Sequence, residues 1–287
     1  MKIVIYGLAK SGTSALFYKI RNSLPPGTIA LFEPRSYGLS DRFLDRLRAL
    51  RSGRWAPSHV IAKVLPWDRR PIRIHDFDRF DRQIVLVRDP RDRLVSGLLY
   101  RNYHASFIRD EKSAAEFLDL LRQKEADPRS VSVLDLLTAF ERLERGVDSP
   151  SSWIEQYKDR GIALPLQFHD RRPQLPVFRY EQLVDEEFGP LEEILGISLD
   201  GAASVPEALQ RVVRTKRYGA WRNWFTPEDC DTLRPLFQPY LDRYYPTARW
   251  DLGTSAQLNP KYGSVYAERV INERRVLWGL APLPRPA

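Results

Sequence analysis

The sequence predicts an α/β fold of three layers, with a central parallel sheet flanked by helices and a helical insertion. Short apolar runs of strand length alternate along the chain with segments of helical periodicity, a pattern typical of parallel α/β sheets. The run at 83–87 is apolar at nearly every position, as expected for a strand buried on both faces. The expected strands lie at 3–6, 29–32, 59–66 and 83–87, and the expected helices at 15–20, 40–50, 131–143, 150–157 and 264–277.

Polar residues mark several expected helix starts. Ser40 is the expected N-cap of the helix that follows it, and Thr226 caps a later one. Ser113 and Glu116 have the spacing of a capping box that opens a helix. The proline-rich end at 282–287 is expected to fray.

Length and composition favour one domain over 1–287, with a core over 2–245 and a C-terminal extension over 246–287. The chain carries 45 Lys+Arg against 37 Asp+Glu, a net charge of +8. Most of the cations are arginines, whose planar guanidinium suits phosphate and sulfate. A polyanionic cofactor or acceptor fits this charge, but the charge alone favours the simpler explanation of an arginine-rich surface.

The cysteine count and the hydropathy indicate where the protein works. Cys230 is the only cysteine, so neither an intramolecular disulfide nor a cysteine metal site can form, and a reducing compartment is expected. No segment approaches the ~20 apolar residues of a membrane span, and a core-type strand follows Lys2 in place of a signal segment. We therefore expect a soluble cytoplasmic protein.

The stretch at 7–14 links the first expected strand to the first expected helix. Gly7 and Gly12 bracket a loop with the spacing of a nucleotide phosphate loop. Its N–H groups and the positive end of the following helix dipole would favour an anion. The usual phosphate loop has lysine directly after its second glycine, whereas here Thr13 holds that position and Lys10 precedes it.

The order Lys-Ser-Gly-Thr-Ser resembles the 5′-phosphosulfate loop of the sulfotransferases that use 3′-phosphoadenosine 5′-phosphosulfate (PAPS). The resemblance implies a P-loop-like fold and PAPS as the sulfuryl donor. It also implies that Lys10 neutralises the charge that grows on the leaving oxygen. The cofactor-binding residues that it implies in this loop are Lys10, Ser11, Gly12, Thr13 and Ser14.

Two further segments resemble the parts of the same family that bind the 3′-phosphate. The segment at 88–96 matches Arg-x-Pro-x-Asp-x-x-x-Ser, which implies that Arg88 and Ser96 hold this phosphate. The segment at 214–226 partly matches the family's C-terminal Arg-Lys-Gly-x-x-Gly-Asp-Trp loop. It offers Arg214, Lys216 and Arg217 as cations, and the sequence leaves open which of them contacts phosphate.

The segment at 176–184 resembles the family's strand-and-turn stretch Arg-Tyr-Glu-Asp-Leu, with Gln182 in place of the acidic residue. The resemblance implies a further strand that closes the sheet.

The general base is the least determined part of the site. Steroid and phenol sulfotransferases end a strand in Lys-x-His and use the histidine, but here Lys63 is followed by valine and leucine. Carbohydrate-type members use a glutamate from the loop after the second strand, which corresponds to Glu33. His75, next to Asp76, is the reserve candidate.

Two other classes of function compete with sulfuryl transfer. An ATP-dependent kinase needs Mg²⁺ and an acidic residue at the end of an apolar strand, but the best such strand ends in Arg88. A polyanion- or nucleic-acid-binding module would explain the charge but neither motif. The four histidines lack metal-ligand spacing. We therefore expect no metal and no nucleic-acid partner, and a small-molecule or carbohydrate acceptor, with the adenine contact unassigned.

Overall fold

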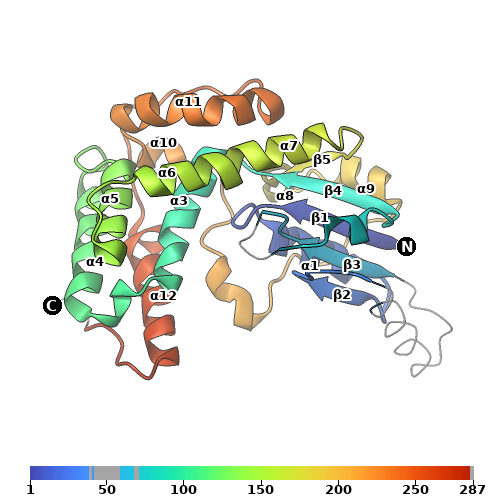
Figure 1. Ribbon diagram of the computed structural model, residues 1–287, viewed down its shortest axis with the longest axis horizontal. Helices are drawn as coiled ribbons and strands as arrows, with labels where there is room; N and C mark the ends of the chain where they lie inside the picture. The colour runs from blue at the N-terminus through green and yellow to red at the C-terminus, as the bar shows by residue number, and fades with distance from the viewer. Residues whose placement is uncertain (39–40, 42–58, 68–70, 285–287) are drawn as a thin grey trace. The chain divides into compact units, whose positions relative to one another are not determined.

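The computed structural model describes residues 1–38, 41, 59–67 and 71–284. The chain forms two compact units, and each is interrupted in sequence by the other. Unit 1 comprises Met1–Arg88 and Leu164–Gln210, and unit 2 comprises Asp89–Ala163 and Arg211–Ala287. Figure 1 labels the strands and helices of both. The assignment of 1–287 to a single domain stays a prediction.

Unit 1 is built on a five-stranded sheet with the order β2-β3-β1-β4-β5. All four neighbouring pairs are parallel, which confirms the predicted α/β class. The expected strands are therefore correct to within a few residues, although β5 is shorter than the segment that predicted it. The strands are β1 Lys2–Gly7, β2 Ile29–Phe32, β3 Val60–Val64, β4 Arg82–Val87 and β5 Val177–Arg179.

Helices cover both faces of this sheet, because its central strands are apolar on both sides. On one face Ile3 and Ile5 of β1 pack against Leu16 of α1 in the core of unit 1. On the other face the Tyr6 ring lies 5.1 Å from the Phe168 ring of α7. This arrangement gives the three layers that the sequence predicts. The helices of unit 1 are α1 Thr13–Ser23, α7 Leu164–Asp170, α8 Tyr180–Val184 and α9 Gly189–Leu195.

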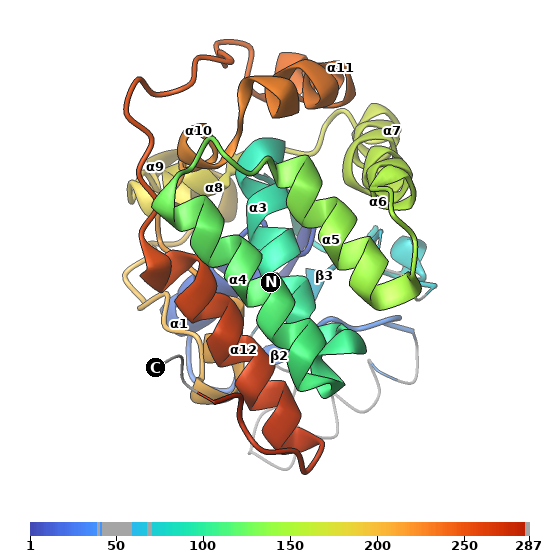
Figure 2. The same ribbon diagram turned by 90° about the vertical axis from the view of Figure 1, so that its left-hand side faces the viewer.

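Unit 2 is helical. Its last helix, α12, contacts both α3 and α4, and Figure 2 shows α12 beside α4. The helices are α3 Pro90–Arg101, α4 Glu111–Ala126, α5 Val133–Arg145, α6 Ser151–Gln156, α10 Trp221–Trp224, α11 Pro227–Tyr244 and α12 Ser264–Leu277. Over the two units together, short 3₁₀ turns lie at Ile74–Phe77, Asn102–His104, Phe107–Arg109, Glu207–Val212 and Pro260–Tyr262. A π-helical segment lies at Tyr157–Ala163.

Most predicted helix ends are confirmed. The Thr226 hydroxyl accepts from the Asp229 N–H at the start of α11, and α12 has the predicted bounds. The capping box at Ser113 is wrong, because α4 begins earlier and the Asp110 carboxylate accepts the Ser113 N–H at 2.8 Å. The helix expected at 40–50 lies outside the described residues, apart from position 41.

The prediction that the C-terminal end at 282–287 frays is also wrong for part of this segment. Leu283 is buried, and its N–H donates to the Asn272 side chain of α12 at 2.8 Å. This side chain fixes a segment that its prolines alone would leave extended, while residues 285–287 lie outside the described part. Among the described residues, no helix is both long and apolar enough to cross a membrane.

Candidate functional site

The loop at 8–12 joins β1 to α1 and turns on two residues with left-handed backbone. Gly12 has a φ of 85° and Lys10 a φ of 67°. A Cβ at Gly12 would lie 2.4 Å from the Tyr180 ring, so only glycine fits this position. Helix α1 then begins at Thr13 without a side-chain cap. Its first N–H groups are therefore available to an anion, and the helix dipole favours one.

Arg88 connects the second motif to this loop within unit 1. The residue follows β4, and it is only 4% exposed. Its Nη1 donates to the Lys10 carbonyl at 2.8 Å, and its guanidinium carbon lies 4.1 Å from the centre of the Tyr180 ring. The Nε and Nη2 atoms are buried and have no hydrogen-bond partner among the described residues. Since unpaired buried donors cost about 1–3 kcal/mol each, these groups call for an acceptor.

Lys63 and Glu33 form an ion pair beside the same loop. The Lys63 Nζ, on β3, lies 2.6 Å from Glu33 Oε1 and 3.0 Å from the Ser14 hydroxyl. The Glu33 N–H donates to the Lys63 carbonyl at 2.9 Å, and Glu33 has a left-handed φ of 54°. Burial lowers the pKa of Lys63, and the neighbouring Glu33 carboxylate partly offsets this effect. The predicted base therefore lies in one hydrogen-bonded chain with a residue of the phosphate loop.

The sequence places Lys63 near the end of an expected strand but predicts no role for it in the site. The available signal was a lysine within a run of apolar strand residues, because such a strand in a parallel sheet is buried on both faces. A buried ammonium group needs a carboxylate or hydroxyl partner. That requirement points toward the carboxyl ends of neighbouring strands, where Glu33 lies.

His75, the reserve candidate for the base, has a different environment. It lies in the 3₁₀ turn Ile74–Phe77, and its side chain is 89% exposed. Its Nδ1 lies 2.9 Å from the Asp78 carboxylate. Among the described residues, His75 makes no hydrogen bond or ion pair with the phosphate loop, with Lys63 or with Glu33.

In unit 2, the motif on α3 contacts the C-terminal loop. The Asp89 side chain accepts the Arg91 N–H and caps α3. The Asp92 carboxylate, which is buried, accepts the N–H groups of Gly219 and Trp221, the latter at 2.9 Å. The aspartate of the motif thus fixes the loop that was predicted to share its ligand. Ser96 is buried on the same helix.

The three cations predicted in the C-terminal loop differ in their surroundings. Arg214 is buried, and its Nη1 donates to the Tyr262 carbonyl at 2.9 Å. Lys216 and Arg217 are exposed, and the Arg217 guanidinium lies 5.8 Å from the Tyr262 ring. Arg214 therefore also supports the loop itself, whereas the other two cations face solvent.

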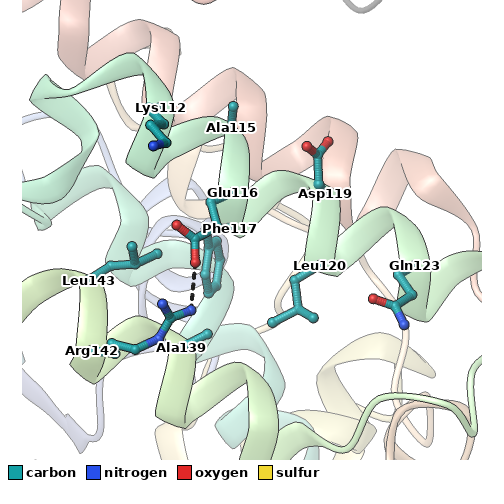
Figure 3. Close-up of a pocket in the computed structure, with 10 residues that line it drawn as sticks. All are labelled: Lys112, Ala115, Glu116, Phe117, Asp119, Leu120, Gln123, Ala139, Arg142 and Leu143. Atoms are coloured by element: carbon teal, nitrogen blue, oxygen red, sulfur yellow. Dashed lines mark hydrogen bonds and ion pairs between the residues drawn. The ribbon is translucent and has the colours of Figure 1, made fainter. Parts of the chain in front are cut away.

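A groove of about 490 Å³ in unit 2 is lined by none of the predicted site residues. Figure 3 shows its lining by α4 and α5, with the Arg142–Glu116 ion pair of 2.6 Å across it. Its walls carry charges of both signs, including Lys112 and Asp119. Over the described ranges, no three histidine, cysteine or carboxylate side chains are grouped to hold a metal ion.

Comparisons with known proteins give structural likenesses but no sequence relative. No family model matches the chain, and no curated protein matches it. Among solved structures it is similar to mouse sulfotransferase SULT7A1 complexed with PAP, with a TM-score of 0.46 and 17% sequence identity over 84% of each chain.

Proposed function

We propose that this protein is a PAPS-dependent sulfotransferase, which transfers a sulfuryl group to a hydroxyl or amine of an acceptor by in-line displacement. The observation that carries the proposal is the contact of Arg88 with the Lys10 carbonyl. Two motifs that resemble the PAPS-binding segments are separated by 78 positions and yet meet at one edge of the sheet. The likeness of each motif to that family is independent of the other.

The residues of the site suit the anionic groups of PAPS. In unit 1, Arg88 offers two buried N–H groups without a partner, and the Ser11 hydroxyl is likewise buried and unpaired among the described residues. The loop residues through Ser14 would hold the 5′-phosphate, with backbone N–H groups as donors. In unit 2, Ser96 and the cations Arg214, Lys216 and Arg217 would hold the 3′-phosphate. PAPS would supply the activated sulfuryl group.

Lys10 and Glu33 would carry the chemistry. Lys10 would stabilise the negative charge on the leaving oxygen, an effect realised mainly in the transition state. Glu33 would accept the acceptor's proton. Its Oε1 accepts a hydrogen bond from Lys63, which orients the carboxylate and leaves Oε2 for the acceptor. With a side chain 43% exposed, Glu33 is also accessible to an acceptor.

We further infer a small-molecule or carbohydrate acceptor and a cytoplasmic location. The free cysteine Cys230 is buried and unpaired, as suits a reducing compartment. No metal ion and no nucleic acid enters the proposed reaction. A kinase would have a metal-binding acidic residue directly after β4. In this chain Arg88 follows β4, and the Asp89 carboxylate forms an ion pair with Arg91.

Calorimetry with nucleotides tests the cofactor. Adenosine 3′,5′-bisphosphate should bind far more tightly than AMP or ATP, without Mg²⁺, because Arg88 and Ser96 would recognise its 3′-phosphate. Mg²⁺-dependent ATP binding that ignores the 3′-phosphate would overturn the assignment in favour of a kinase.

A screen of hydroxylated acceptors with PAPS tests the role of Lys10. Lys10→Ala should raise the barrier to sulfuryl transfer by ~2.7–4 kcal/mol and so lower the maximal rate. The affinity for the cofactor should change little.

The identity of the base is tested by two variants on one acceptor at saturating PAPS. Glu33→Gln keeps the shape of the side chain and should slow transfer to a hydroxyl by roughly 10²–10⁴-fold. His75→Ala should leave the rate nearly unchanged, because His75 is exposed and bonded to Asp78. The reverse pattern would assign the base to His75.

A further inference from the structure

The π-helical segment Tyr157–Ala163 packs against the first turn of α3 in unit 2. Segments of this kind are rare, and they occur frequently at functional sites. The Tyr157 hydroxyl donates to the Pro90 carbonyl at 2.9 Å. In the opposite direction, Nη2 of Arg93 donates to the Gly161 carbonyl at 2.8 Å. Two buried side-chain bonds, one donated by each segment, therefore join the π-helical segment to α3.

The sequence explains why the Gly161 carbonyl is available to Arg93. In a continuous α-helix this carbonyl would accept the N–H of residue 165. Position 165 is a proline, which has no N–H. The helix is π-helical just before this proline, and the Gly161 carbonyl accepts from the Arg93 guanidinium. Since Nε of Arg93 is buried without a hydrogen-bond partner among the described residues, this carbonyl helps to offset the burial of the charge.

Glycine is required at position 161 by the closeness of the same two side chains. A Cβ there would lie 2.9 Å from Nη2 of Arg93, and 3.1 and 3.2 Å from two ring carbons of Tyr157. The guanidinium carbon of Arg93 in turn lies 4.3 Å from the centre of the Tyr157 ring. The three residues are therefore in mutual contact, and any side chain at position 161 would force one of the other two to move.

The Tyr157 ring is itself held on two sides. It stacks on the Trp153 ring of α6, with the ring centres 5.3 Å apart and an interplanar angle of 14°. The Phe237 ring of α11 lies 5.5 Å from it. Both of these neighbours are buried. The hydroxyl that bonds to Pro90 is thus carried on a fixed ring.

Anchoring the first turn of α3 has consequences for the residues that this helix positions. The motif at 88–96 leaves position 93 unspecified, so it gives Arg93 no role. The neighbouring Asp92 carboxylate accepts the N–H groups of Gly219 and Trp221 in the C-terminal loop. Ser96 lies about one helical turn after Arg93, on the same face of α3. The position of α3 therefore sets the positions of Ser96 and of the C-terminal loop together.

We propose that the π-helical segment is a positioning element for the 3′-phosphate subsite of unit 2, with Tyr157 and Gly161 as its positioning residues. The inference rests on the proposed function, because the 3′-phosphate of PAPS is the group that Ser96 and the C-terminal loop would bind. Tyr157 and Gly161 act through α3 and not on the nucleotide. They should therefore affect recognition of the 3′-phosphate and leave recognition of the 5′-phosphate, which the loop of unit 1 would bind, unchanged.

Calorimetry with two nucleotides tests this role, because adenosine 3′,5′-bisphosphate and AMP differ only in the 3′-phosphate. Tyr157→Phe removes the bond to the Pro90 carbonyl and should weaken binding of the bisphosphate by roughly three- to tenfold, in line with the net contribution of one hydrogen bond. Gly161→Ala displaces Arg93 or the Tyr157 ring and should weaken it by about tenfold or more. In both variants the affinity for AMP should change by less than about twofold.

Tyr6→Phe provides a matched control in unit 1. It also removes a tyrosine hydroxyl, which donates to the Gln83 side chain near the start of β4, and it should leave both affinities unchanged. Thermal unfolding checks that each variant is folded. If Gly161→Ala does not fold, Tyr157→Phe still decides the question, because it adds no atom to the packed site.

The outcomes separate this inference from the proposed function. A wild-type protein that binds AMP as tightly as the bisphosphate would overturn the proposed function, and this inference with it. A wild-type preference for the bisphosphate that persists in full in the folded variants would overturn the positioning role alone. Equal weakening of both nucleotides would also overturn it, because that pattern indicates a general loss of structure. A smaller preference with unchanged AMP affinity supports the proposal.

Discussion

Replacement of Gly12 by alanine should damage both the fold and the anion site. The new Cβ would lie 2.4 and 2.8 Å from two carbons of the Tyr180 ring, closer than any relaxed contact, so the ring must move. The backbone at Gly12 is left-handed, which adds about 1–2 kcal/mol for alanine. Overpacking of a filled site typically adds about 1–3 kcal/mol. We therefore expect a loss of roughly 2–5 kcal/mol of stability.

The loss of ligand affinity follows from the second contact of the same ring. Tyr180 packs against the Arg88 guanidinium at 4.1 Å, so a displaced ring leaves this arginine less fixed. One charged hydrogen bond is worth about 1.5–3 kcal/mol, and its loss would weaken binding of adenosine 3′,5′-bisphosphate by roughly 10- to 150-fold. Calorimetry gives the affinity, and thermal unfolding of the same sample gives the stability.

A second glycine provides the matched control. Gly97 lies within α3, and a Cβ there would meet no atom within 4 Å. Gly97→Ala should therefore be neutral or stabilising by up to about 1 kcal/mol and should bind the nucleotide normally. In the double variant Gly12→Ala/Tyr180→Leu, the smaller side chain should recover part of the stability. Wild-type nucleotide affinity in Gly12→Ala would refute the reasoning.

Three further predictions concern buried charges. Burial lowers the pKa of Lys124 to about 8, below its unfolded value near 10.5, so the folded state binds fewer protons between these values. The stability of wild type relative to Lys124→Met should therefore rise by up to about 3 kcal/mol as the pH increases from about 8 to 10.5. A difference in unfolding free energy, measured with urea, that does not change with pH would contradict this. Asp92→Asn should weaken the hold on the Trp221 N–H and speed amide exchange there, with α12 exchange as the internal control. Lys63→Met should speed amide exchange at the Glu33 N–H, because it removes the ammonium group that lies 2.6 Å from the Glu33 carboxylate, and unchanged exchange would exclude this role of the ion pair.

The sequence alone determined the elements and the position of the candidate loop, because their signals are local. Apolar runs placed β1 to β4, the resemblance at 176–184 placed β5, and a hydroxyl before Pro227 placed the start of α11. Where a local signal failed, a nearby competitor explains it. Asp110 lies three residues before Ser113 and caps α4 in its place.

The tertiary structure alone decided which distant residues meet. Glu33 and Lys63 are 30 positions apart, Lys10 and Arg88 78, and Asp92 and Trp221 129. These contacts depend on strand order and register, which bring the ends of β2 and β3 together, and on helix packing within each unit. Periodicity and capping act over a few residues, so no pattern in the sequence specifies such pairs.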